Sequence, residues 1–208
     1  MFEQFQWWPF LLTITVLTLS PGVDSLLVIR NSSRGGWRDG VLTSVGVCTG
    51  LFFHAAISAA GLSVILLSSA ELFLALKLAG AAYLVWLGVQ GLRAAWRSRR
   101  VEIPRVTGQS LCVSRSLREG LLSNLLNPKP IVFYMAFLPQ FVDPAYSALL
   151  QSLAMAAVHF LIGMLWLALL AAGVQRAKQW LARPAVSGGI DGVTGLLLIA
   201  IGVRLGTS

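Results

Sequence analysis

The chain is dominated by long apolar runs separated by polar loops, and this pattern constrains its fold more than any other feature. A helix that crosses a bilayer needs about 20 mostly apolar residues. The sequence has six such windows, at residues 5–29, 41–67, 72–92, 120–141, 148–174 and 190–206. Of the 208 residues, 56% are hydrophobic and only 12% are charged, whereas about 25% are charged in a typical soluble domain. The sequence therefore predicts an all-α integral membrane protein with six transmembrane helices.

The positive charges are concentrated in alternate loops. Of the 16 Lys and Arg residues, 13 fall in the first, third and fifth connections, and the second and fourth connections have none. Because short cytoplasmic loops are rich in Lys and Arg, we expect these three connections in the cytoplasm. Both termini are then periplasmic, in a bacterial inner membrane, although Arg204 is an exception to the pattern. The net charge of +8 is not gathered on a folded polar surface, so we expect no nucleic-acid partner.

The two halves of the chain show faint similarity. An X-Pro pair interrupts the first and fourth windows, and His54 and His159 lie at the centres of the second and fifth. With three windows per half, the second half lies inverted in the membrane, as in many secondary transporters. We expect one domain that consists of two inverted three-helix repeats, about 1–93 and about 119–208, joined by a solvated cytoplasmic loop at about 94–118.

Two tripeptides interrupt apolar sequence, namely Ser20-Pro21-Gly22 in the first window and Asn127-Pro128-Lys129 in the fourth. Proline breaks a helix interior, yet a Ser or Asn followed by Pro also suits a helix start, with the polar residue as N-cap and proline in the first position. The tripeptides therefore predict that spans 1 and 4 are broken at proline. The freed N–H groups of such half-helices can bind an anion, often a substrate carboxylate in transporters. The alternative is that both prolines only kink packed helices.

Two charged residues lie beside these breaks, and ionisable groups within spans usually face the bundle interior. Asp24 could accept an ammonium group or a proton, and Lys129 could hold a carboxylate. Together they would suit a zwitterionic amino acid. The alternative is that Asp24 and Lys129 pair with each other or extend towards the membrane interface.

The remaining polar residues favour no other chemistry. His54 and His159 could relay protons or act as hydrogen-bonded packing residues. Neither Cys48 nor Cys112 belongs to a CxxC pair, and no cluster of His, Cys and carboxylates indicates a metal site or a catalytic set. We therefore expect neither a cofactor nor an enzymatic activity. Glycines such as Gly46 are expected to permit close helix packing, which would also allow a homodimer.

Several motifs together resemble one known family. They are Leu19–Asp24, Lys77–Gly88, Gly120–Lys129 and Phe137–Phe141. Over essentially the whole chain, these motifs resemble the LysE/RhtB group of bacterial amino-acid exporters, although Val23 stands where that family usually has a second proline. The resemblance implies a six-span exporter of amino acids or their derivatives, driven by the proton-motive force.

The sequence thus leads to the hypothesis of a secondary exporter. The predicted substrate-binding residues are Ser20, Pro21, Gly22, Asp24, Asn127, Pro128 and Lys129. The predicted proton-coupling residues are Asp24, His54 and His159. The expected partners are a small amino acid, protons and the lipid bilayer. A metal-ion or other small-solute exporter, or a passive channel of the same fold, is the alternative.

Overall fold

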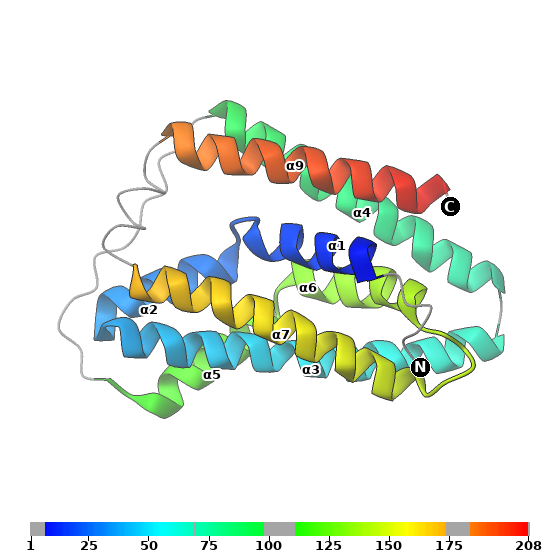
Figure 1. Cartoon of the computed structure of the whole chain (residues 1–208), viewed down its shortest axis with the longest axis horizontal. Helices are drawn as coiled ribbons and strands as arrows, with labels where there is room; N and C mark the ends of the chain where they lie inside the picture. Colours follow the sequence, from blue (N-terminus) through cyan, green and yellow to red (C-terminus); the bar gives the residue numbers. More distant parts are fainter. Residues whose placement is uncertain (1–6, 69, 98–110, 174–183, 208) are drawn as a thin grey trace.

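A computed structural model describes residues 7–68, 70–97, 111–173 and 184–207, and they are almost entirely helical, with no strand among them (Figure 1). The α-helices are α1 (Trp7–Leu19), α2 (Val23–Gly35), α3 (Trp37–Ser68), α4 (Ala70–Arg97), α5 (Val113–Leu125), α6 (Pro128–Val132), α7 (Ala148–Ala172) and α9 (Pro184–Thr207). A π-helix, η1 (Phe133–Phe137), and a 3-10 helix, η2 (Leu138–Phe141), continue directly from α6.

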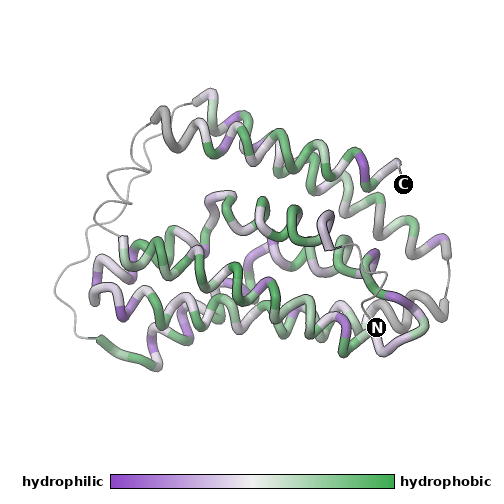
Figure 2. The backbone as a smooth tube through the Cα atoms, viewed as in Figure 1, coloured by the Kyte–Doolittle hydropathy of each residue, from purple (hydrophilic) through white to green (hydrophobic). Residues whose placement is uncertain are grey.

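Several of the described helices suit a membrane by length and composition. Three of them contain long apolar stretches, at Trp37–Gly61, Ala148–Ala172 and Gly189–Thr207. The pair α1 and α2 also qualifies as one span that is bent by 50° at its break, which raises the number to four. Hydrophobic residues cover most of α7 and α9 (Figure 2). The described part of the chain is therefore consistent with a helical membrane protein.

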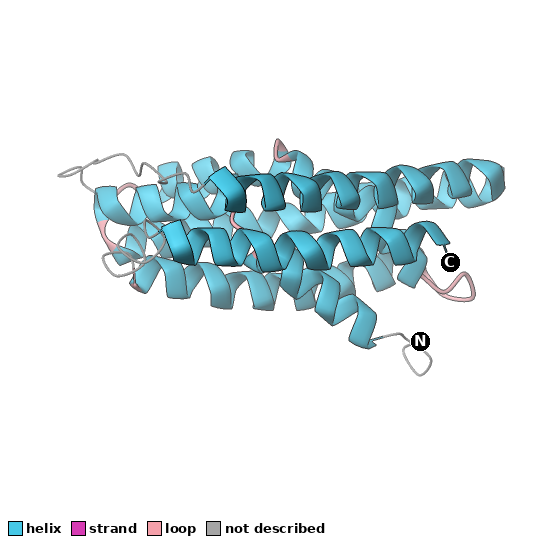
Figure 3. Ribbon diagram, turned by 90° about the horizontal axis from the view of Figure 1, so that it is seen from above, coloured by secondary structure: helices cyan, strands magenta, loops and turns pink. Residues whose placement is uncertain are grey.

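The helices lie roughly along the long axis of the molecule (Figures 1 and 3). Both termini are at one end, and the turn between α2 and α3 is at the other. Gly36 forms this turn with a φ of 80°, in the region that favours glycine. Helix α3 packs against α2, α5 and α7, whereas α4 packs chiefly against α9. The two helix breaks face the interior formed by α3 and α7.

The expected solvated loop at about 94–118 is shorter than predicted. Helix α4 extends to Arg97, and α5 begins at Val113, so both ends of that stretch are helical. Arg115 donates a hydrogen bond to Glu119 at 2.8 Å, four residues later, and such a spacing stabilises a helix. Residues 98–110 of the predicted loop lie outside the described part of the chain.

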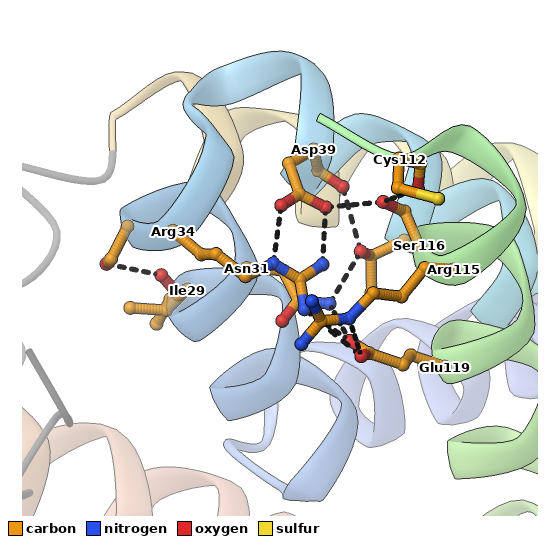
Figure 4. A network of polar contacts seen from close by, with 10 residues as sticks. Ile29, Asn31, Arg34, Asp39, Cys112, Arg115, Ser116 and Glu119 are labelled. Carbon is orange, nitrogen blue, oxygen red and sulfur yellow. Dashed lines mark hydrogen bonds and ion pairs between the residues drawn. The ribbon is translucent and has the colours of Figure 1, made fainter. Parts of the chain in front are cut away.

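An ionic layer joins α2, α3 and α5 near the α2–α3 turn (Figure 4). It consists of Asn31, Arg34, Asp39, Arg115, Ser116 and Glu119. Arg34 donates two hydrogen bonds to Asp39, at 2.8 and 2.9 Å, and two to Glu119, at 3.1 and 2.9 Å. Arg34 and Asp39 are only 5% and 1% exposed. From the sequence, Arg34 was expected to be one of the 13 cations in cytoplasmic connections. A buried charge needs such partners.

Further hydrogen bonds extend the ionic layer across the helices. Asn31 donates to Glu119 at 2.8 Å and to Thr43 at 2.9 Å, and Ser116 donates to Asp39. Burial would raise the pKa of the Glu119 carboxyl, but hydrogen bonds from Arg115, Asn31 and Arg34 outweigh it and lower the pKa to about 2. Glu119, which precedes the predicted span 120–141, is therefore ionised at physiological pH.

Glycines bring α3 and α5 into direct backbone contact, as expected from the sequence. A Cβ atom at Gly46 would overlap the carbonyl oxygen of Leu117, and a Cβ atom at Gly120 would overlap that of Thr43. These contacts are reciprocal, so neither helix has room for a side chain at its crossing point. The close packing holds the ends of α3 and α5 together beside the ionic layer.

We expect Gly120→Ala to lower the free energy of unfolding by about 1–3 kcal/mol, because the overlap outweighs the better helix propensity of alanine. Gly61→Ala in α3 is the matched control, since a Cβ atom there meets nothing within 4 Å. Thermal unfolding of the purified proteins in detergent compares the two. Equal stability of both variants would contradict this account of the α3–α5 crossing.

Candidate functional site

The two predicted breaks exist, and they face each other. Helix α1 ends at Leu19 and α2 begins at Val23, while α5 ends at Leu125 and α6 begins at Pro128. The prediction that helices are interrupted at these two X-Pro pairs is therefore confirmed, and the alternative of two simply kinked helices is wrong. The half-helices α2 and α6 run in opposite directions from the breaks (Figure 1).

The predicted cap chemistry holds at only one of the breaks. At the second break Asn127 is the N-cap of α6, its side chain accepts a hydrogen bond from the Lys129 amide at 3.0 Å, and Pro128 follows in the first position. At the first break the prediction is wrong. The N-cap of α2 is Gly22, because the Ser20 amide still donates to Val16 and so completes the last turn of α1. Pro21 lies between the two helices.

A cavity with a volume of about 70 Å³ lies between the breaks, which is room for several water molecules. The predicted site residues that line it are Ser20, Gly22, Asp24, Asn127, Lys129 and His159. Pro21, Pro128 and His54 are not in its lining. Apolar residues of α3 and α7 form the opposite wall, namely Val47, Cys48, Leu51, Gly163 and Leu167. The cavity thus has one polar side, at the breaks, and one apolar side.

Asp24, in the first turn of α2, is held by the end of α5. Its carboxylate accepts hydrogen bonds from Ser123 at 2.6 Å, from Asn124 at 3.0 Å and from Asn127 at 3.1 Å. All three partners are donors, which suits an ionised carboxylate. The aspartate therefore links the first half of the chain to the second at the cavity.

Lys129, in the first turn of α6, reaches back to the first break. Its Nζ atom donates to the carbonyl oxygen of Ser20 at 2.8 Å. Asp24 and Lys129 both line the cavity, but no ion pair within 4.0 Å joins them among the described residues. The alternative that these two charges simply pair is therefore not what the structure shows.

His159 of α7 has partners on both ring nitrogens. Its Nε2 atom lies 3.1 Å from the Thr18 hydroxyl, and its Nδ1 atom lies 3.1 Å from the Tyr134 hydroxyl. The Thr18 hydroxyl donates its proton to the carbonyl oxygen of Ile14 at 2.6 Å, so it accepts from Nε2, and Nδ1 accepts from Tyr134. This network fits the neutral imidazole with its proton on Nε2.

His54 of α3 lies behind the cavity. Its Nε2 atom is 3.1 Å from the carbonyl oxygen of Asn124, which can only accept, so the nitrogen donates. His54 is buried and its ring lies 6.0 Å from that of Tyr134. The residue thus supports the end of α5, where Asn124 in turn holds Asp24.

Sequence reasoning missed the residues that hold the charged groups in place. Ser123 and Asn124 belong to a quoted family motif, but nothing in their spacing shows that they reach Asp24 in the other half of the chain. Tyr134 and Thr18 were missed for the same reason, since their contacts with His159 are between different helices. Among the described residues, no group of three or more His, Cys, Asp or Glu side chains could hold a metal ion.

Comparison with known proteins connects this cavity to a family. The sequence matches the family described as LysE type translocator over residues 15–208. The chain belongs to this family. The resemblance to the LysE/RhtB group that the motifs indicated is therefore confirmed.

Relatives of this LysE type translocator are similar over nearly their whole length. The homoserine/homoserine lactone efflux protein of Salmonella typhimurium is 33% identical over 205 residues, which are 98% of each chain. An uncharacterized membrane protein of Pseudomonas aeruginosa is 35% identical over 97% of this chain and 94% of its own. The threonine efflux protein of Escherichia coli is 27% identical, over 91% and 92%. No solved structure matches significantly.

Asn127 has two roles at the site of this translocator, which substitutions can separate. Asn127→Ala removes the N-cap of α6 and one donor to Asp24, so we expect the free energy of unfolding to fall by about 2–4 kcal/mol. Asn127→Ser keeps a capping oxygen and loses only the reach to Asp24, so about half of that loss is expected. Thermal unfolding in detergent measures both, and a serine variant as unstable as the alanine variant would contradict the capping role.

Proposed function

We propose that this protein is a secondary exporter that moves a small amino acid, or an amino-acid derivative, out of the bacterial cytoplasm. The observation that carries the proposal is one cavity that holds Asp24 from the first helix break and Lys129 from the second. The names of the relatives support it, because two of them are efflux proteins for homoserine or its lactone and for threonine.

The same proposal includes the membrane topology. Six passes form two inverted repeats, about 1–93 and about 119–208. The pass at the first break is α1 with the first two turns of α2, and the pass at the second is residues 120–141, from the last turns of α5 to η2. Both termini then face the periplasm and the ionic layer faces the cytoplasm of an inner-membrane protein. Two features support this arrangement, namely the cations of the alternate loops and the position of both termini at one end of the molecule (Figure 1).

The cavity chemistry matches both ends of a zwitterion. An ammonium side chain has three donors, and Lys129 uses one of them on Ser20, so its other donors can bind the substrate carboxylate. The substrate ammonium group binds the Asp24 carboxylate, and the side chain lies against the apolar wall formed by Val47, Leu51 and Leu167. Neutralising both substrate charges in this way offsets their loss of hydration inside the membrane.

Asp24 also provides for proton coupling. The carboxylate binds the substrate ammonium group when it is ionised and releases that group when a periplasmic proton takes its place. A proton carried inward on Asp24 is thereby exchanged for an amino acid carried outward. Proton relay by His54 and His159 stays a prediction, and the neutral hydrogen-bonded form of His159 favours a supporting role for that residue.

Asp24→Asn and Lys129→Met should each reduce export at least about tenfold, because each removes a charge-assisted hydrogen bond to the substrate that is worth about 1.5–3 kcal/mol. Uptake of labelled homoserine and threonine into inside-out vesicles measures the effect. Asp143→Asn is the control, since Asp143 is exposed in the connection after η2, and it should transport like the unmodified protein. Normal flux in both charge variants would overturn the proposal.

Transport should also depend on the proton gradient. In inside-out vesicles, an acidic lumen should drive accumulation of the amino acid, and an ionophore that collapses the gradient should abolish accumulation while leaving exchange of labelled for unlabelled substrate intact. Asp24→Asn should retain no gradient-dependent component. Accumulation that is unaffected by the ionophore would contradict proton coupling but not export itself.

A further inference from the structure

The ionic layer lies between the cavity and the α2–α3 turn. Arg34 is ten residues beyond Asp24 on α2, which is about 15 Å along the helix axis. On α5, Glu119 is five residues before Asn124, about 7.5 Å from it. Asn31, Arg34 and Asp39 are almost completely buried, so their side chains fill the space between the helices at this level.

On the opposite side of the cavity lies a layer of different chemistry. Phe10 of α1, Phe133 and Phe137 of η1, and Phe141 of η2 form an aromatic layer. Its ring centroids are 5.5 Å apart for Phe10 and Phe141, 4.9 Å for Phe137 and Phe141, and 5.0 Å for Phe133 and Phe137. Phe10, Phe133 and Phe137 are buried. The layer joins the first half of the chain to the second on this side of the cavity.

We propose that the ionic layer and the aromatic layer are two separate gates of the cavity, and that each opens it to one face of the membrane. This inference rests on the proposed function, because a carrier has to expose its cavity to the two faces in turn. In the described structure the side chains of both layers are packed against one another.

The ionic gate opens by separating α5 from α2 and α3. Within the layer three hydrogen-bonded contacts have to break, namely Arg34 with Glu119, Asn31 with Glu119, and Ser116 with Asp39, and the glycine crossing of α3 and α5 has to loosen as well. The bonds between Arg34 and Asp39 lie within the continuous α2–α3 segment and can persist. Because buried ions that separate regain hydration, a buried ion pair contributes little net stability compared with its contact energy. Charged groups therefore suit a contact that has to open into water and close again.

The aromatic gate contains no charged group that would gain hydration on opening. It therefore opens only if its phenylalanine rings pack against other side chains. Helix η1 offers a means, because π-helical segments are weak points at which a helix changes register, and they occur frequently at functional sites. The carbonyl oxygen of Tyr134 in η1 accepts a hydrogen bond from Ser58 of α3 at 2.6 Å. This bond fixes η1 to α3 when the gate is closed.

Two native cysteines make the gates testable. Cys48 is buried and lines the cavity, whereas Cys112 is exposed at the start of α5, at the same end of the molecule as the ionic layer. A Cys48→Ser protein, in which only Cys112 reacts, identifies the membrane face of the ionic gate. A Cys112→Ser protein, in which only Cys48 reacts, reports access to the cavity from each face of sealed vesicles.

The experiment compares one variant of each gate in the Cys112→Ser protein, with an impermeant methanethiosulfonate reagent. Glu119→Gln should raise the rate of Cys48 labelling at least about tenfold from the Cys112 face only, because it weakens the charge-assisted hydrogen bonds that Glu119 accepts, and about tenfold corresponds to weakening one of them. Phe137→Ala should raise it from the opposite face only. Each variant is the control for the other, since both perturb the fold but at different ends of the cavity.

Equal increases from both faces, or unchanged labelling in both variants, would overturn the two gates. If Glu119→Gln does not give a monodisperse protein, Ser116→Ala takes its place. It removes one of the three contacts of the ionic gate and leaves every charge, so a smaller increase is expected, from the same face. If the protein transports amino acids but Cys48 labelling does not differ between the two membrane faces, the gates are refuted and the proposed export function is not. If labelling differs between the faces as expected but no amino acid is transported, the proposed export function is refuted and the gates are not.

Discussion

A carboxylate inside a membrane protein has to be surrounded by donors or it is expelled towards water, and the architecture of this protein depends on how Asp24 meets that requirement. Three donors at the end of α5 and the start of α6 satisfy it, and the two helix breaks bring these groups to one cavity. The breaks expose backbone groups, which are tolerated at membrane depth where they line a cavity. The Asp24 carboxylate, the two helix breaks and the cavity therefore depend on one another, and the two halves of the chain are in contact there.

Contacts elsewhere in the molecule hold the helices around Asp24 in place. Reciprocal glycine contacts press α3 against α5, while the ionic layer joins α2, α3 and α5 on one side and the phenylalanines join α1 to η1 and η2 on the other. His159, stacked on Tyr134 with ring centroids 5.9 Å apart, closes the cavity wall from α7. Helices α4 and α9 pack mainly on each other, so the polar interior is formed almost entirely by the remaining helices.

The sequence was most informative where local chemistry alone decides the structure. Apolar windows located the long helices, Asn127-Pro128 located the start of α6 with its cap, and Gly46 indicated a close helix contact. The cap at the first break was mispredicted, because a Ser-Pro pair can end one helix as readily as it begins another. The ionic layer was missed because Arg34 and Glu119 are 85 residues apart, and nothing in the sequence indicates that they meet. The pairs Arg34 with Asp39 and Arg115 with Glu119 were the local signals available for it.

The wide turn at Phe133–Phe137 has a consequence for how the segment from α6 to η2 can change shape. An α-helix advances about 1.5 Å and turns about 100° per residue, and a π-helical turn accommodates one residue more than an α-helical turn does. If the wide turn migrates along the segment, the residues that it passes rotate by roughly that angle while the helix stays continuous. Part of the segment can therefore rotate about the helix axis and present other side chains to its neighbours, while its backbone groups stay hydrogen-bonded.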